Sequence, residues 1–384
     1  MPDALPPVIR ASNLRKYFGG HAVVQDVSFA VAAGETLVLL GPSGCGKTTL
    51  LKLLNRLIEP DAGTVEINGR DVMAQAPAVL RRGIGYVIQQ VGLLPHYTVA
   101  ENVAVVPRLL GHAPTAIAAR TTALLTRLHL PPARYAGQYP HQLSGGQQQR
   151  VGLARALAAD PPSVLLDEPF GALDPLTRAS VRREFRELEE LRSKTVVLVT
   201  HDVTEAFELA DRIMLLDAGR IQQLGTPREL LFRPANDFVR SFFAAERLAL
   251  QLHTLTLGDV WASQEVNNAA WAVHSTQEEA HNSGIAQTTP VIEVNNLVEL
   301  VNKDSPRVNE FAHYLPHSSA STPANSLVRR AESQIYSSFT PNTTVHAALE
   351  ALTGATVAAA PFTVAQLMAA FGEALQREEG AWKR

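Results

Sequence analysis

The sequence predicts an α/β fold with a largely parallel sheet and an inserted helical subdomain. Over roughly the first 230 residues, short β-rich runs alternate with helical stretches, which is the pattern of such a sheet. Between Val99 and Ala159 the β signal disappears and helical patterns replace it. A third observation is a glycine-rich loop that follows an apolar strand and precedes a helix, as phosphate-binding loops do in α/β domains.

Apolar, β-branched runs predict the strands Val24–Phe29, Thr36–Leu40, Thr64–Ile67, Gly85–Ile88, Val164–Leu166, Thr195–Thr200 and Arg212–Leu216. Asn68-Gly69 and Ala218-Gly219 are turn signals of the hairpin type. In the inserted region we expect three helical stretches, which are broken at Gly111, at Pro131-Pro132 and before Leu143.

Composition excludes several classes of protein. The formal net charge is −3, from 34 basic and 37 acidic residues, so there is no basic excess to bind a nucleic-acid backbone. Cys45 is the one cysteine, which excludes an internal disulfide and a cysteine-based metal site and fits a reducing cytoplasm. The N-terminal residues show no signal-peptide pattern, and we expect none.

After about Phe243 the character of the sequence changes. Thr254–Val260 and Pro290–Val294 are expected to be strands, and the Ser-, Thr-, Pro- and His-rich residues 314–325 an exposed loop. Residues 351–372 carry no charge and are long enough to span a bilayer. Because they are mainly alanine and threonine with a proline in the middle, we expect them not to insert into a membrane.

The glycine-rich loop matches G-x-x-x-x-G-K-[ST] and consists of Gly41, Pro42, Ser43, Gly44, Cys45, Gly46, Lys47 and Thr48. Its glycines allow backbone N–H groups to surround phosphate oxygens at a helix N-terminus, where the helix dipole also favours anions. We expect Lys47 to reach the β- and γ-phosphates of a nucleotide and the Thr48 hydroxyl to bind Mg²⁺.

Two further strands end in reactive side chains. The run Val164–Leu166 leads into Asp167, which is placed to hold Mg²⁺ through water, and Glu168, which can polarise an attacking water. The run Thr195–Thr200 delivers His201 to a strand end, where ligands bind in doubly wound sheets.

A second phosphate-ready helix start follows at Leu143-Ser144-Gly145-Gly146-Gln147. A nucleotide already bound around Lys47 does not need a second anion site in the same subunit. Taken alone, the segment also fits a flexible glycine-rich helix start, but its spacing of 18 residues before the Val164 strand weakens that interpretation.

In combination these segments resemble the ABC ATPases, over roughly Val8 to Phe243. Residues 41–49, which end at Thr49, resemble the Walker A loop. Residues 164–168 resemble the Walker B strand. Residues 143–147 resemble the family signature, and Gly171-Ala-Leu-Asp174 resembles the D-loop. Gln89 is similar in position to the Q-loop glutamine, His201 to the switch histidine, and Phe18 to the aromatic residue that stacks on adenine.

The resemblance implies an active ATPase with ATP and Mg²⁺ as ligands, a cassette at residues 1–243 and a helical subdomain at about 90–160. It implies catalytic roles for Glu168, His201 and Gln89, and Mg²⁺ ligands at Thr48, Gln89 and Asp167. It also implies a head-to-tail pair of cassettes, in which Ser144, Gly145, Gly146 and Gln147 contact the ATP of the other subunit and Asp174 couples the two sites. Expected partners are a second cassette, an integral membrane permease and, indirectly, an extracytoplasmic solute-binding protein. The expected location is the cytoplasmic face of the inner membrane.

Residues 54–60 and 84–96 resemble importers of quaternary amines such as glycine betaine, choline, carnitine or proline. The sequence also leaves open the alternative of an importer for another small solute, such as an amino acid. A non-transport ABC protein would require two cassettes in one chain or a long heptad insert, and the sequence has neither. Residues 257–260, 341–352 and 362–370 resemble parts of a degenerate CBS pair, so residues 244–384 form either a regulatory domain or a partly disordered tail.

Overall fold

The computed structural model describes residues 7–89, 92–171, 173, 175–256, 259, 343–348, 367, 371, 372, 374, 375 and 378. The chain divides into two compact units, Met1–Leu250 and Gln251–Arg384. In the part of the chain that is described, no helix is long and apolar enough to cross a membrane.

The first unit contains two sheets. The larger has the strand order β10-β9-β3-β8-β7-β6 and is parallel except for the β9–β10 hairpin. Its strands are β3 (Thr36–Leu40), β6 (Ile84–Val87), β7 (Ser163–Asp167), β8 (Thr195–Val199), β9 (Arg212–Asp217) and β10 (Arg220–Gly225). Strands β7 and β8 are buried along their whole length, as expected for a parallel sheet covered on both faces.

The smaller sheet is antiparallel, with the order β2-β1-β4-β5. Its strands are β1 (Ile9–Phe18), β2 (His21–Val31), β4 (Ala62–Ile67) and β5 (Arg70–Asp71). Both predicted hairpin turns are confirmed: Asn68-Gly69 joins β4 to β5 and Ala218-Gly219 joins β9 to β10, and all four residues have positive φ. Strand β1 was missed because charged residues and register shifts interrupt its alternation.

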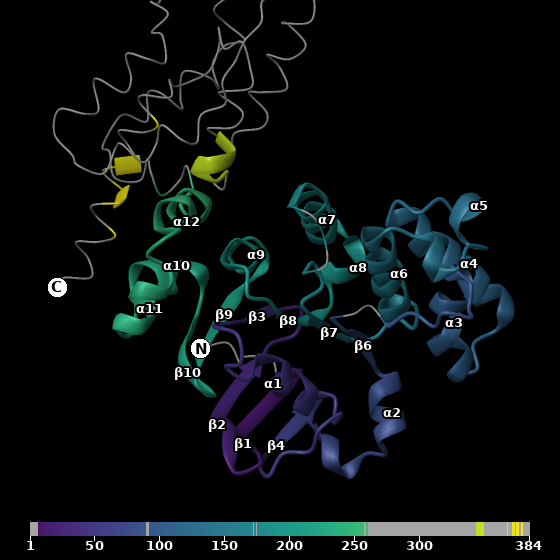
Figure 1. Cartoon of the computed structure of the whole chain (residues 1–384), viewed down its shortest axis with the longest axis horizontal. Coiled ribbons are helices and arrows are strands. Elements are labelled where there is room, and N and C mark those ends of the chain that lie inside the picture. The colour runs from purple at the N-terminus through teal and green to yellow at the C-terminus, as the bar shows by residue number, and fades with distance from the viewer. Residues whose placement is uncertain are drawn as a thin grey trace, which may run out of the picture. The chain divides into compact units, whose positions relative to one another are not determined.

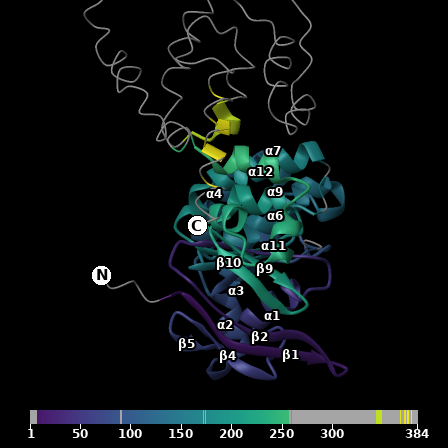
Figure 2. The ribbon, with the colours of Figure 1, turned by 90° about the vertical axis from the view of Figure 1, so that its left-hand side faces the viewer.

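Helix α1 (Lys47–Leu54) lies between the two sheets, in contact with β2, β7 and β8. Its four leucines are fully buried in the main core, together with residues from both sheets. In Figures 1 and 2 the small sheet lies on one side of the large sheet, and α7 (Pro175–Glu187) and α9 (Val203–Leu209) lie on the other. The remaining elements of the core are α2 (Pro77–Arg82), α8 (Glu189–Arg192), α10 (Pro227–Phe232), α11 (Asp237–Phe242), α12 (Arg247–Thr254) and the 3-10 helix η1 (Val72–Ala74).

The inserted region is helical, and Figure 1 shows it beside β6. It contains α3 (Val99–Leu109), α4 (Pro114–Arg127), α5 (Pro132–Tyr135), the 3-10 helix η2 (Pro140–Gln142) and α6 (Gly145–Leu157). The expectation of three helical stretches was too low, because the chain also forms two short helical turns, α5, which begins at Pro132, and η2, which begins at Pro140. Helix α6 packs against β6 and α7, and thereby connects this region to the large sheet.

In the second unit, the prediction of a strand over Thr254–Val260 is wrong at both ends of the segment. Thr254 ends α12, and Asp259 is helical. The Thr256 N–H and hydroxyl both donate to Asp259 Oδ2, at 3.0 and 2.8 Å, and the Asp259 N–H donates back to the hydroxyl at 3.2 Å. This reciprocal hydrogen bonding is the pattern of a helix cap, and Thr256 also forms a β-bridge to Thr344. The other segments interpreted in the tail lie largely outside the described residues.

Gly63 and Gly69 provide a test of the close packing in the small sheet. Both have positive φ, but a Cβ at Gly63 would lie 2.5 Å from the Asn13 carbonyl oxygen and even closer to that of Ser12, whereas Gly69 has open space. We expect Gly69→Ala to lower the free energy of unfolding by about 1–2 kcal/mol. Gly63→Ala should lower it by about 2–5 kcal/mol, because the new Cβ at Gly63 forces the strands apart. Urea unfolding followed by circular dichroism measures both, and equal losses would contradict the packing argument.

Candidate nucleotide site

The phosphate loop connects β3 to α1 and depends on glycine at its most crowded positions. Gly44 and Gly46 have φ values of +79° and +105°. A Cβ on Gly46 would lie 2.5 Å from the Val23 carbonyl oxygen, and one on Gly41 would collide with the Leu216 carbonyl oxygen. The loop is therefore pressed against backbone on two sides, and its form requires glycine.

Lys47 lies inside this loop. Its side chain is buried, and Nζ donates to the carbonyl oxygens of Gly41 and Pro42 at 2.8 and 2.9 Å. The positive charge is thus held at the centre of the curl, where it can meet phosphate oxygens. The neighbouring Cys45 thiol is also buried, and this burial raises its pKa.

Thr48 and Asp167 meet although 119 residues separate them in the chain. The Thr48 hydroxyl donates to Asp167 Oδ1 at 2.9 Å. Burial raises the pKa of the Asp167 carboxyl, while the Thr48 hydrogen bond and the charge of Lys52 act in the opposite direction. A cation beside this carboxylate would offset the cost of its burial.

These two oxygen groups fit Mg²⁺, which prefers hard oxygen ligands and keeps several that are not from the protein. Within the described part of the chain, no three or more His, Cys, Asp or Glu side chains form a metal cluster. Two protein oxygen groups leave coordination positions of such an ion for other ligands, such as phosphate oxygens.

The Glu168 carboxylate contacts the two other predicted catalytic residues, Gln89 and His201. Its Oε2 accepts a hydrogen bond from Gln89 Nε2 at 2.9 Å, and its Oε1 lies 3.3 Å from His201 Nδ1. Three segments that are distant in sequence thus converge on one carboxylate. The arrangement holds both oxygens of a potential general base in fixed positions.

The backbone at Glu168 is unusual, because its φ is +47°. The left-handed conformation costs a non-glycine residue about 1–2 kcal/mol, and such strained positions cluster at functional sites. The Glu168 N–H donates to the Val199 carbonyl at 2.9 Å, and its carbonyl accepts from Gly171 N at 3.2 Å. The chain therefore turns sharply at Glu168, and its side chain leaves the line of Asp167.

Ser144 begins α6 with a capping box. Its hydroxyl accepts from Gln147 N at 3.4 Å, and the Gln147 side chain accepts from Ser144 N at 2.9 Å. Ser144 and Gly145 are exposed. Figures 1 and 2 both show α6 apart from α1, so the structure does not bring the signature segment and the phosphate loop together within one chain.

Phe18 lies at the end of β1, next to the Gly19-Gly20 turn, with 46% of its surface exposed. Tyr17 is equally exposed, so exposure does not distinguish the two. The Lys16 ammonium lies 5.5 Å from the centroid of the Phe18 ring. The hairpin thus presents a half-exposed aromatic ring that a planar base could stack on.

Two residues outside the predicted set position the site, Asp61 and Arg155. Asp61 accepts from Tyr17 N at 2.6 Å and pairs with Lys16 Nζ at 3.0 Å, which secures the Phe18 hairpin. Arg155 of α6 donates to the Gly92 carbonyl at 2.7 Å and so ties α6 to the segment after Gln89. Neither residue belongs to a local pattern, so no sequence signal pointed to them. Asp174, predicted to couple two sites, lies outside the described residues.

Comparison with known proteins agrees with this geometry. The family model described as "ABC transporter" matches residues 24–171. The chain is 53% identical to the glycine betaine/carnitine/choline transport ATP-binding protein OpuCA of Bacillus subtilis, over 60% of this chain and 61% of the relative. It is 43% identical to the glycine betaine uptake system ATP-binding protein YehX of Escherichia coli, over 76% of this chain and 94% of the relative. The chain spans only 59–63% of the length of several curated relatives.

Among solved structures, the dimeric post-hydrolysis state of the ATP-binding cassette MJ0796 bound to ADP and Pi is 34% identical. It matches with a TM-score of 0.52 and covers 57% of this chain and 98% of that one. The expected cassette fold is therefore confirmed: two sheets, an inserted helical region and a phosphate loop between β3 and α1. With these relatives and this arrangement of residues, the chain belongs to the ATP-binding proteins of the ABC transporter family.

Proposed function

We propose that this chain binds and hydrolyses Mg²⁺-ATP as the ATPase subunit of an importer of quaternary amines. The observation that carries the proposal is the Glu168 carboxylate, held between Gln89 and His201 one residue after Asp167. A carboxylate positioned by two neighbours beside a metal-binding pair can orient an attacking water and accept its proton.

Each group of the site has its own role in ATP binding and hydrolysis. Lys47 and the backbone N–H groups of the loop bind the phosphates, and Phe18 stacks on the base. Thr48 and Asp167 hold Mg²⁺, which when bound neutralises charge on the phosphate oxygens. Glu168 orients the attacking water and accepts its proton.

We further propose that two copies of the cassette share each site, with Ser144 of one facing the phosphate loop of the other. The chain has one copy of each motif. The similar cassette MJ0796 is described as dimeric and bound to ADP and Pi. An exposed capping box at the start of α6 suits an anion bound by a second chain, since its N-terminal groups face outward.

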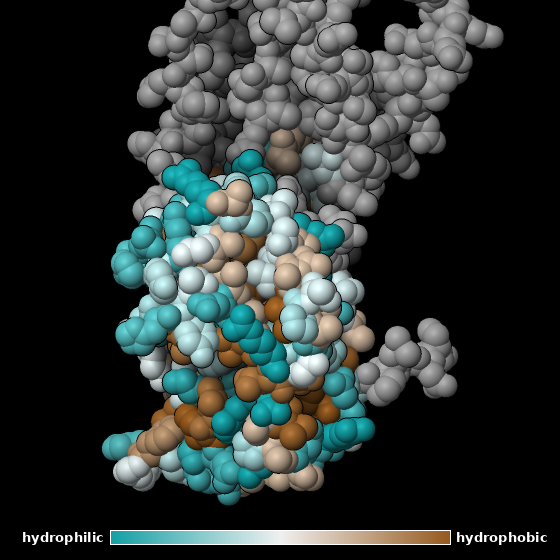
Figure 3. All heavy atoms as spheres, turned by 90° about the vertical axis from the view of Figure 1, so that its right-hand side faces the viewer, coloured by the Kyte–Doolittle hydropathy of each residue, from teal (hydrophilic) through white to brown (hydrophobic). Residues whose placement is uncertain are grey.

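A membrane permease is the proposed partner at the segment around Gln89. Ile88, Leu94 and Tyr97 there are 37%, 40% and 42% exposed. Figure 3 shows the face of the molecule on the side of α3–α5, and the apolar residues there gather mainly on its lower part, at the height of α2 in Figure 1. Exposed apolar surface of this kind favours a protein partner, and a permease would place the cassette at the cytoplasmic face of the membrane.

The quaternary-amine substrate rests on OpuCA and YehX, whose names give glycine betaine, carnitine and choline. An importer of another small solute is the alternative, because other subunits contact the solute. The chain can be co-purified from membranes with its permease and solute-binding protein, and binding of radiolabelled choline to that complex can then be measured. This experiment would distinguish a quaternary-amine importer from an importer of another small solute.

The Glu168→Gln variant should bind ATP normally, lose about 10²–10⁴-fold in turnover and accumulate as an ATP-bound dimer. The amide keeps the shape of the side chain but cannot accept a proton. Size-exclusion chromatography with and without ATP measures the dimer, and Lys47→Ala, which lacks the phosphate-binding cation, is the control that should stay monomeric. Wild-type turnover in Glu168→Gln would refute the assigned role.

Alkylation of Cys45 should be slow at neutral pH and should accelerate as the pH rises above the ordinary range of thiols. The reason is that the thiolate is the reactive form and burial raises the pKa of this thiol, so less thiolate is present at a given pH. Bound ATP should slow the reaction further. Mass spectrometry of iodoacetamide-treated protein measures the rate. A rate equal to that of free cysteine, or one that ATP does not change, would place Cys45 away from the nucleotide.

Ser144→Arg should leave ATP binding to the monomer nearly intact and abolish hydrolysis, because the bulky side chain blocks closure against the partner's phosphates. Ser144→Ala is the matched control for the lost helix cap, which costs about 1 kcal/mol of stability. Mixing Ser144→Arg with Lys47→Ala creates mixed dimers in which one composite site is intact, so some ATPase activity should return. A Ser144→Arg protein that hydrolyses ATP normally on its own would refute the shared site.

A further inference from the structure

The turn that carries His201 is held on both sides of the histidine. The Thr200 hydroxyl accepts from Asp202 N at 3.0 Å and donates to Glu205 Oε2 at 2.5 Å. The Asp202 carboxylate accepts from Glu205 N at 3.0 Å and so caps the start of α9. Glu205 is only 3% exposed, so this small network anchors the turn to the protein interior.

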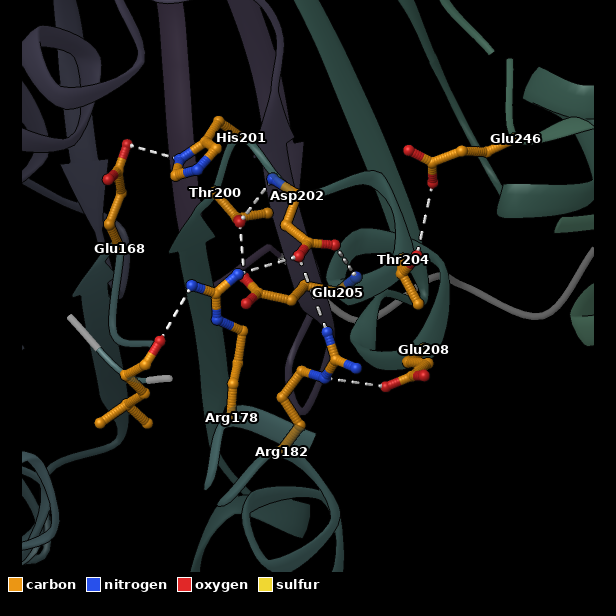
Figure 4. A network of polar contacts seen from close by, with 11 residues as sticks. Glu168, Arg178, Arg182, Thr200, His201, Asp202, Thr204, Glu205, Glu208 and Glu246 are labelled. Atoms are coloured by element: carbon orange, nitrogen blue, oxygen red, sulfur yellow. Dashed lines mark hydrogen bonds and ion pairs between the residues drawn. The ribbon is translucent and has the colours of Figure 1, made fainter. Parts of the chain in front are cut away.

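Two arginines of α7 approach the same turn from the opposite side, as Figure 4 shows. Arg178 Nη1 lies 3.5 Å and Arg182 Nη1 lies 3.8 Å from Asp202 Oδ2. Arg182 makes its other contact with Glu208 of α9, at 3.2 Å from Nε. Arg182 therefore connects α7 with the turn and the helix that follows it.

Arg178 has a different second contact. Its Nη2 atom donates to the Leu173 carbonyl oxygen at 3.1 Å. Leu173 lies in the short segment between Glu168 and α7. One guanidinium thus joins the segment that follows Glu168 to the turn that carries His201.

We propose that Arg178 is a positioning residue that sets the contact between Glu168 and His201. These two side chains meet at 3.3 Å across the two segments that Arg178 links. A planar guanidinium with several fixed donors suits such a link, because it can contact a carbonyl and a carboxylate at once. The inference rests on the proposed function, since it assigns Arg178 to ATP hydrolysis at the same site.

The test is steady-state Mg²⁺-ATPase activity of the full chain. Arg178→Met keeps the aliphatic part of the side chain and removes both polar contacts. We expect kcat to fall roughly 10–100-fold, because displacement of a catalytic group by about 1 Å has costs of this order, while KM for ATP changes less than about 2-fold. Arg178→Lys keeps the charge and should recover part of kcat. Arg183→Met, an exposed position on the same helix, is the matched control and should behave as wild type.

Asp202→Asn gives an independent route to the same link. Asparagine still caps α9, so the helix start is preserved while the charge that faces Arg178 and Arg182 is lost. The variant should lower kcat by a similar factor or more. The double variant Arg178→Met/Asp202→Asn should lose less than the sum of the two single losses, since the contact between Arg178 and Asp202 can be broken only once. Thermal unfolding of each variant separates loss of fold from loss of positioning.

Three outcomes would overturn the inference: wild-type kcat in Arg178→Met, fully additive losses in the double variant, or a fall in kcat matched by a fall in thermal stability that Arg178→Lys does not reverse. A wild-type chain without Mg²⁺-dependent hydrolysis would overturn the proposed function itself. Hydrolysis by the wild type with no effect of Arg178→Met would refute this inference alone.

Discussion

The parallel register of β3, β8 and β7 is the constraint on which the site depends. Leu39 pairs with Val199, and Val199 pairs with Asp167 on its other side, so the three strands end level with one another. The phosphate loop follows β3, Asp167 ends β7 with Glu168 directly after it, and His201 lies two residues beyond the end of β8. Because parallel strands present their carboxyl ends at one edge of a sheet, a single set of backbone hydrogen bonds collects there the groups that we propose to bind phosphate and metal and to activate water.

Burial gives these groups their chemical character. Lys47 and Asp167 are both buried, and the ionised form of each is costly unless an opposite charge or a hydrogen bond compensates it. Lys47 is compensated by two loop carbonyls and Asp167 by the Thr48 hydroxyl. A nucleotide with its metal ion would complete both arrangements, since phosphate supplies negative charge to the lysine and Mg²⁺ supplies positive charge to the carboxylate.

Glu168 differs from these groups because its position depends on contacts between separate segments. It departs from the sheet in a left-handed conformation, and its carboxylate meets Gln89 and His201 from two other segments. The side chains that hold those segments include Arg155 on the Gln89 side, while Arg178 links the His201 turn to the segment after Glu168. Small shifts of α6 or α7 would therefore alter the surroundings of this carboxylate without disturbing the phosphate loop.

The sequence by itself determined the cassette, the phosphate loop, the two hairpin turns and the order of the reactive strand ends, because each rests on local patterns of glycine, apolar runs and charge. The sequence did not show β1, whose apolar alternation is interrupted, or α5, which begins at a proline. It also did not show the helical start at Thr256, where a reciprocal cap outweighs the apolar pattern. Only the tertiary structure decided which residues hold the site together. Asp61, Arg155 and Arg178 act on backbone or carboxylate groups of other segments, and no periodicity along the chain encodes a contact made across space.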